Sequence, residues 1–154
     1  TWFGSAVCLI LLTIILFVFI KNKNIGVLIG TNLIIITVLN QLFKFILQRP
    51  RPTEYRIINE VGYSFPSGHS MISMAFYGFL IYLIYKQIKN KYLKIPLISI
   101  LSILIILIGI SRIYLGVHYT SDVIAGFLIS ISYLIVFIEF ANKIVFEKEK
   151  KYEK

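Results

Sequence analysis

Five long apolar stretches, separated by short polar segments, dominate this chain. Each is close in length to the roughly 20 residues that an α-helix needs to cross the hydrocarbon core of a bilayer. Helix is the expected state of all five, because lipid offers exposed backbone groups no hydrogen-bond partners. The pattern therefore predicts an all-α, polytopic transmembrane helical bundle of five spans that forms a single domain. The spans are expected at roughly residues 2–20, 25–43, 70–85, 95–111 and 122–141 of the 154 residues.

Composition supports this class. Hydrophobic residues make up 58% of the chain, against roughly 45–50% in soluble domains. The only cysteine, Cys8, lies in the first apolar stretch, so neither a disulfide framework nor redox chemistry is expected. The first stretch has no basic segment before it and no small-residue cleavage site before Lys21, which distinguishes it from a signal peptide.

The net charge of +9 marks the orientation of the bundle rather than a nucleic-acid partner. Eleven of the lysines follow the first, third or fifth stretch, so alternating spans place them all on one side. The positive-inside rule makes that side cytoplasmic, and residues 142–154 are then a charged cytoplasmic tail. Five spans leave the first residue outside, and one earlier span would return the N-terminus to the cytoplasm. These lysines are Lys21, Lys23, Lys86, Lys89, Lys91, Lys94, Lys143, Lys148, Lys150, Lys151 and Lys154.

Three polar clusters are predicted on the opposite, outer side. The first consists of Lys44, six intervening residues, and then Arg51-Pro52. Pro50 and Pro52 should end the second helix, because each disfavours helix in the residue before it. A basic outer helix end, with Arg49 as a further cation, runs against the positive-inside rule and indicates an anion site. The alternative is that these side chains extend toward lipid headgroups.

The second cluster, Pro66-Ser67-Gly68-His69, directly precedes the third apolar stretch. Ser67 is placed to cap a helix, and Gly68 allows the backbone to approach a ligand closely. Free amides at a helix N-terminus bind anions, and His69 would stand beside such a site. The alternative is a capped helix start with a histidine at the membrane interface.

The third cluster is Ser111-Arg112, five residues, His118, three residues, and Asp122. Residues four apart share a face of a helix, so Asp122 can bond one imidazole nitrogen of His118 and make the other a better nucleophile or base. Arg112 can bind a phosphate through two N–H groups. The alternative is that Asp122 only caps the fifth span while His118 lies among headgroups.

Taken together, the clusters predict a phosphate-handling site at one membrane face. A metal site is disfavoured, because two histidines and three outer carboxylates lack ligand spacing. A serine hydrolase is disfavoured too, because Ser67 has no nucleophile-elbow motif and the cations would be unexplained.

The ordered set of three clusters over residues 44–122 resembles the type 2 phosphatidic acid phosphatase (PAP2) superfamily without departure from its motifs. That resemblance implies a six-span core whose first span is absent here, a metal-independent phosphatase activity and no cofactor. It also implies roles. His118 would attack phosphorus, Asp122 would orient His118, and His69 would protonate the leaving group. Lys44, Arg51, Ser67, Gly68 and Arg112 would hold the phosphate.

The resemblance further implies a lipid phosphate substrate, presented at headgroup depth on the outer face of the cell membrane. Undecaprenyl diphosphate is the favoured substrate, because its phosphate is removed on that face. Phosphatidylglycerol phosphate and phosphatidic acid remain alternatives, as does a non-catalytic protein that binds or translocates lipid phosphates. A haloperoxidase is disfavoured because those family members are soluble. The sequence does not fix the oligomeric state.

Overall fold

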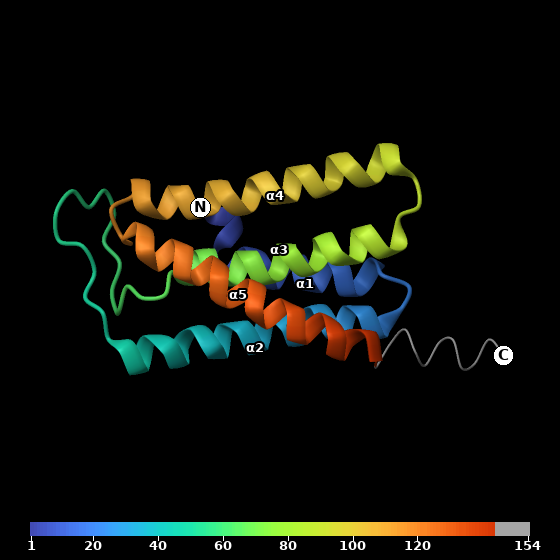
Figure 1. Cartoon of the computed structure of the whole chain (residues 1–154), viewed down its shortest axis with the longest axis horizontal. Coiled ribbons are helices and arrows are strands. Elements are labelled where there is room, and N and C mark those ends of the chain that lie inside the picture. The colour runs from blue at the N-terminus through green and yellow to red at the C-terminus, as the bar shows by residue number, and fades with distance from the viewer. Residues whose placement is uncertain (144–154) are drawn as a thin grey trace.

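The computed structural model describes residues 1–143, and these form a bundle of five α-helices that run along one common axis (Figure 1). The all-α prediction is confirmed, since no strand occurs within this range. The predicted tail at 142–154 lies largely outside the described residues. The elements are a short 3-10 turn at Trp2–Gly4, then α1 Ala6–Phe19, α2 Lys23–Leu47, α3 Gly68–Gln87, α4 Lys91–Tyr114 and α5 Thr120–Ala141.

Four of the five helices, α2 to α5, are long and apolar enough to cross a membrane. The first expected span is shorter than the sequence predicted, because α1 has 14 residues. At 1.5 Å per residue it is about 21 Å long, against a hydrocarbon core of about 30 Å. Ser5 caps α1 by accepting a hydrogen bond from the backbone N–H of Cys8 (3.4 Å), and the preceding residues form a 3-10 helix whose Gly4 lies against α4 and the start of α3.

Helix α3 lies at the centre of the bundle and packs against α2, α4 and α5. A Cβ atom at Gly126 would lie 3.2 Å from backbone atoms of Met71 and Ser67, so the missing side chain lets α5 lie close against the start of α3. Polar side chains also join the helices. The Ser130 hydroxyl donates to Met71 O (2.7 Å), in keeping with the small and polar residues that hold membrane helices together.

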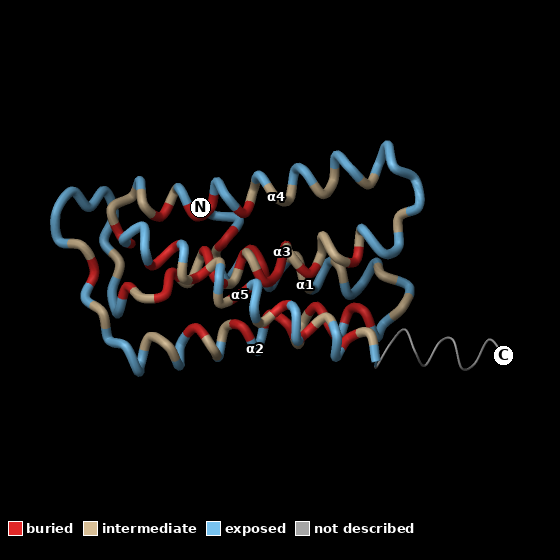
Figure 2. The backbone as a smooth tube through the Cα atoms, in the orientation of Figure 1, coloured by how far each residue is buried: buried red, intermediate tan, exposed pale blue. Residues whose placement is uncertain are grey.

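The outward faces of the helices remain apolar and exposed, and α4 shows this along much of its length (Figure 2). Ile103, Ile106 and Ile110 of α4 are each more than half exposed. Such a surface is suited to lipid rather than water, because a water-soluble monomer rarely exposes so large a continuous apolar patch.

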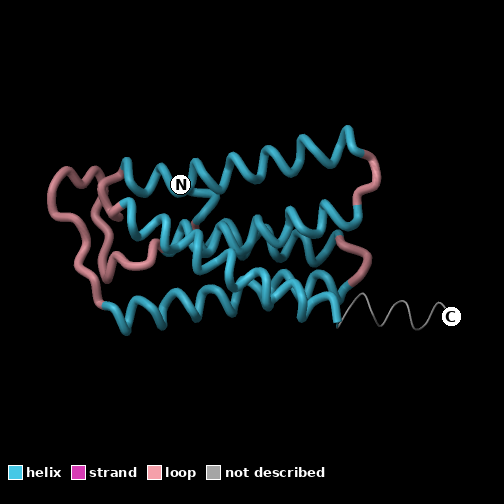
Figure 3. Tube along the Cα trace, in the orientation of Figure 1, coloured by secondary structure: helices cyan, strands magenta, loops and turns pink. Residues whose placement is uncertain are grey.

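Two connections meet at one end of the bundle, which we call the motif end. They are the long segment 48–67 between α2 and α3 and the short segment 115–119 between α4 and α5 (Figure 3). The backbone N–H of Ile57 donates to Leu115 O (3.1 Å), which ties the two connections together. Gly116 is required here, because its φ is +70° and a Cβ atom would lie 2.4 Å from Tyr55 O.

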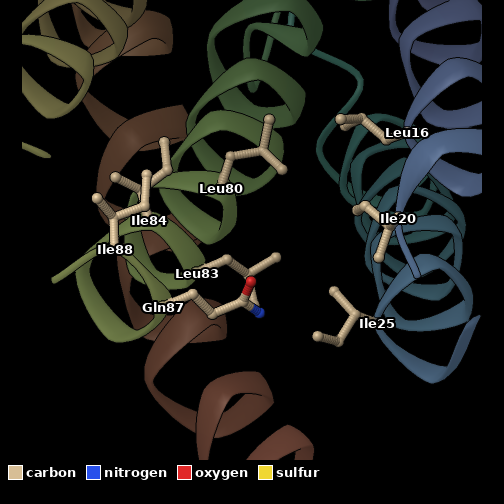
Figure 4. A pocket seen from close by; sticks show the side chains of 8 residues that line it. All are labelled: Leu16, Ile20, Ile25, Leu80, Leu83, Ile84, Gln87 and Ile88. Carbon is tan, nitrogen blue, oxygen red and sulfur yellow. The ribbon is translucent and has the colours of Figure 1, made fainter. Parts of the chain in front are cut away.

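Toward the opposite end of the bundle, there is a gap between α1 and α3. An apolar cavity of about 210 Å³ lies there (Figure 4). Gln87 is the one polar side chain among its lining residues, so this cavity offers packing space and no reactive groups. The other lining residues are Leu16, Ile20, Ile25, Leu80, Leu83, Ile84 and Ile88.

Candidate active site

The three predicted clusters converge at the motif end. The last turn of α2 supplies Lys44, and the connection that follows supplies Arg51. Two contacts join clusters that are distant in sequence. The backbone N–H of Ser67 donates to Asp122 O (3.1 Å), and an Arg51 Nη1 atom lies 3.2 Å from His118 Nε2. The structure thus brings all eight predicted site residues to the start of α3, the end of α4 and the start of α5.

His118 and Asp122 form the predicted pair. Their side chains are nearly completely buried, and Nδ1 of the imidazole lies 3.5 Å from a carboxylate oxygen. That oxygen also accepts the backbone N–H of Tyr119 (2.9 Å), which fixes the orientation of the carboxylate. The Nδ1–O separation is longer than an ordinary hydrogen bond, as is common for catalytic contacts before a ligand binds.

The contact with Arg51 identifies the tautomer of His118. A guanidinium N–H can only donate, so Nε2 of the imidazole accepts with its lone pair and the proton stays on Nδ1, toward Asp122. Burial lowers the pKa of His118; the hydrogen bond to Asp122 opposes this effect, and the charge of Arg51 adds to it. The imidazole is therefore neutral at neutral pH, with its unprotonated nitrogen pointing at a cation.

The three phosphate-binding candidates Lys44, Arg51 and Arg112 are held by the polypeptide around them. Arg51 donates from Nε to Gly62 O (3.0 Å) and from Nη1 to Val117 O (3.0 Å). Lys44 Nζ donates to a backbone carbonyl at residue 63 (2.6 Å). A cavity of about 420 Å³ opens beside Lys44 and Arg51.

Arg112 is almost fully buried, with 1% of its surface exposed. Within residues 1–143, its Nε atom has no hydrogen-bond partner. A buried donor without an acceptor costs free energy, so this atom is available to an oxygen of a ligand. Burial lowers the pKa of Arg51, and the charge of Glu60 opposes this effect.

The second cluster forms the start of α3 as predicted, with Ser67 at the N-cap position and fully buried. The Ser67 hydroxyl accepts from Ser70 Oγ (3.0 Å) instead of capping a backbone amide. A Cβ atom at Gly68 would lie 3.1 Å from the side-chain oxygen of Asn40, so glycine allows α2 to approach this turn. His69, the second residue of α3, lies against Gly4 of the N-terminal 3-10 turn.

Two charged residues belong to the site without being among the eight predicted site residues, although Arg49 was noted as a further cation of the first cluster. Arg49 donates to the second oxygen of Asp122 (2.7 Å) and to Ser121 Oγ (2.8 Å). The Glu60 carboxylate bridges two cations, with one oxygen paired to Arg112 and the other 3.1 Å from Arg51. A carboxylate in the loop after a basic motif indicates an ion pair with one of the cations. The spacing alone does not show which cation it would reach.

Comparison with known proteins agrees with this geometry. The sequence profile of the PAP2 superfamily matches residues 7–146. A phosphatidylglycerophosphatase B from Bacillus subtilis is 32% identical over 101 residues, which cover 65% of this chain and 49% of that protein. An undecaprenyl-diphosphatase from Sulfolobus acidocaldarius is 31% identical over 147 residues, covering 89% of this chain and 66% of that protein. The chain therefore spans about half to two thirds of the length of these relatives.

Solved structures extend the likeness to the fold. A transmembrane PAP2-type phosphatidylglycerolphosphate phosphatase from Bacillus subtilis superposes with a TM-score of 0.83 at 30% identity, over 93% of this chain and 73% of that one. Aquifex aeolicus LpxE gives a TM-score of 0.71 at 27% identity, over 90% and 80% of the two chains. With its apolar helices and these relatives, the chain is a multi-pass membrane protein. Three motifs that meet at one end of a matching helical bundle, together with a profile match over most of the sequence, show that the chain belongs to the PAP2 superfamily.

Proposed function

We propose that this protein is a membrane lipid phosphatase that works through a phosphohistidine intermediate. One observation carries the proposal: a buried imidazole directs the unprotonated nitrogen Nε2 at a guanidinium, and the charges of Lys44 and Arg112 also act on it. Phosphoryl transfer needs a positioned nucleophile and positive charge around the transferred oxygens, and this site supplies both.

In the proposed reaction, Nε2 of His118 forms a bond to phosphorus while the bond from phosphorus to the leaving oxygen breaks. His69 gives its proton to that oxygen, so the product leaves uncharged at that atom. Asp122 stabilises the positive charge that develops on the His118 ring. Water then attacks the phosphohistidine and passes a proton to His69, which releases inorganic phosphate and restores both histidines.

The phosphate oxygens would be held by Lys44, Arg51 and Arg112, together with the Ser67 hydroxyl and the Gly68 amide at the start of α3. The unpartnered Nε of Arg112 supports this assignment, because a phosphate oxygen would satisfy a buried donor. The charge comes from protein side chains, so no metal ion is needed in this mechanism.

Undecaprenyl diphosphate is the substrate that we favour, and phosphatidylglycerol phosphate or phosphatidic acid the alternatives. Relatives named for the first two substrates share about equal identity with this chain, so likeness alone does not separate them. Orientation supports the first. The eleven lysines outside the motifs lie toward the end opposite the site or in the C-terminal tail. The motif end would thus face the outside of the cell membrane, where that diphosphate is recycled.

The test is a substrate panel on the purified protein in detergent, with phosphate release measured for the three lipids and for matched phosphodiesters. Hydrolysis of undecaprenyl diphosphate with the highest kcat/KM supports the favoured assignment, and preference for another lipid phosphate replaces it. Binding of lipid phosphates without any release of phosphate would instead indicate a protein that binds or translocates them.

A further inference from the structure

Glu60 pairs with two of the three cations that are proposed to bind phosphate. Its two carboxylate oxygens pair with Arg51 and Arg112, which are separated by 61 positions in the sequence and meet only at this site. Arg51 also contacts Nε2 of His118, so the carboxylate sits beside the proposed nucleophile. A planar, bidentate anion between two guanidiniums has the same binding chemistry as two oxygens of a phosphate group.

Neighbouring carbonyls continue this pattern. Arg51 donates from Nη2 to Val61 O (3.3 Å) and from Nε to Gly62 O (3.0 Å), and Lys44 donates to Tyr63 O (2.6 Å). Residues 60–63 therefore form a strap of acceptors across the cations, and Glu60 is its one charged member. The Glu60 pKa is lowered: burial raises it, but the hydrogen bond and charge of Arg112 and the charge of Arg51 outweigh burial. The carboxylate is thus ionised at neutral pH.

Residues 60–63 can move away from Arg51 and Arg112 without removing every contact that holds these arginines in place. The Glu60 side chain is 27% exposed, at the edge of the site, and Val61 next to it is almost fully exposed. Gly62 has a φ of +81°, and a Cβ atom there would meet nothing within 4 Å, so the backbone has space to move. Arg51 would keep its bond to Val117 O, and the site would stay in place after Glu60 moves out.

We propose that Glu60 is a selectivity residue that competes with substrate for Arg51 and Arg112 and keeps weakly bound anions out of the site. This inference rests on the proposed function for its substrate class. Displacing Glu60 costs the same free energy for every anion. A terminal phosphate with two charges, held by three cations, still binds after that cost. The phosphodiester of a bulk membrane lipid has one charge and is attracted less strongly, so the same cost keeps it out of the site.

The selectivity has a purpose in a membrane. Phosphodiester lipids surround a membrane protein, and their headgroups would lie at the depth of the motif end. Without a competitor, even weak binding to the arginines would fill the site, because the lipid is present in vast excess over any substrate. A tethered carboxylate acts at a high effective concentration and counters that excess.

The test compares Glu60→Gln with the unchanged protein and with Glu54→Gln, which removes the same charge from an exposed position in the same loop. Two readouts are used on the full chain in detergent micelles. The first is binding of inorganic phosphate by calorimetry, which does not depend on turnover. The second is inhibition of lipid phosphate hydrolysis by phosphatidylglycerol added at rising mole fraction.

We expect E60Q to bind inorganic phosphate about tenfold more tightly, which corresponds to about 1.4 kcal/mol. Phosphatidylglycerol should inhibit E60Q at mole fractions that leave the unchanged protein and E54Q active. Equal or weaker phosphate binding by E60Q would overturn the proposal and make Glu60 a support for the arginines. If E60Q does not fold, Glu60→Asp replaces it: its shorter carboxylate cannot bridge both arginines, and a folded E60D that binds phosphate no more tightly also overturns the proposal.

The two proposals fail separately. Tighter phosphate binding by E60Q in a protein that hydrolyses no lipid phosphate would refute the phosphatase assignment and leave the competition by Glu60 intact. Normal hydrolysis with phosphate binding unaffected by E60Q would refute only the role of Glu60.

Discussion

Replacing Arg49 should slow catalysis without weakening substrate binding. Arg49 forms no hydrogen bond with the phosphate-binding candidates among the described residues. Its Nη1 atom donates to Oδ1 of Asp122 (2.7 Å), and the other carboxylate oxygen faces His118. Its guanidinium also lies 4.2 Å from the centre of the Tyr119 ring, which holds it in place. In the proposed mechanism, Asp122 stabilises an imidazolium that forms on His118 only during the reaction. Loss of Arg49 should therefore lower kcat and leave KM unchanged.

The size of the effect follows from the contact. A hydrogen bond to a charged group contributes about 1.5–3 kcal/mol. The side chain of Arg49 is 37% exposed while Asp122 is fully buried, so water screens part of the interaction. About 1–1.4 kcal/mol then remains, and Arg49→Gln should reduce kcat about five- to tenfold. Asp122→Asn removes the carboxylate itself and should cost much more, up to about 10⁴-fold by analogy with other His-carboxylate pairs.

Steady-state kinetics on a soluble short-chain phosphate, with Arg49→Lys alongside, test this reasoning. R49K keeps the charge and should recover part of the lost kcat, which a role in packing against Tyr119 would not explain. In an Asp122→Asn background, R49Q should have almost no further effect, because the partner is gone. A raised KM at constant kcat would make Arg49 a phosphate ligand and refute the argument, as would additive losses in the double variant.

Four further outcomes are expected. His118→Ala should abolish turnover, whereas His69→Ala should lose about 10²–10⁴-fold on an alkyl phosphate and less on p-nitrophenyl phosphate, whose leaving group needs no proton; equal losses on both substrates would contradict this division of roles. EDTA should leave activity intact, because the charges are side chains, and a loss that Mg²⁺ or Zn²⁺ restores would contradict the mechanism. In NMR titrations the His118 ring should protonate below pH 6.5, since burial and the charge of Arg51 oppose the imidazolium; a midpoint at or above 6.5 would count against a neutral nucleophile. In a cysteine-free background, a cysteine at Glu54 should react with an impermeant maleimide on intact cells and one at Asn90 only after lysis; the reverse pattern would place the site on the cytoplasmic side.

Local patterns in the sequence sufficed to predict much of this molecule. Apolar runs predicted the helices, and prolines predicted the end of α2, whose last residue is Leu47. The spacing of four between His118 and Asp122 predicted a pair that the structure shows side by side. These features depend on helical period and chain stiffness, which a short segment expresses by itself.

Other features depended on contacts between distant segments. The short α1 was not predicted, because the same apolar run could have formed a full span, and a buried Gly4 against Ile108 and His69 decides otherwise. Asp122 lies 73 positions from its partner Arg49, and Arg112 lies 52 positions from its partner Glu60. No periodicity relates residues across an irregular loop. The sequence therefore shows that these charged residues are present, but it does not predict which of them form ion pairs.

The carboxylate that partners the arginines of the site comes from the loop between the first two motifs. Three cations gathered beside a histidine repel one another strongly in partly buried surroundings, and such charges need partners to remain there. Glu60 partners Arg51 and Arg112, and Arg49 in turn partners the carboxylate behind His118. Neither Glu60 nor Arg49 is itself a motif residue. If Glu60 competes with the substrate as proposed, chains with identical motifs can differ in how firmly they hold an anion, according to the charges that this loop carries.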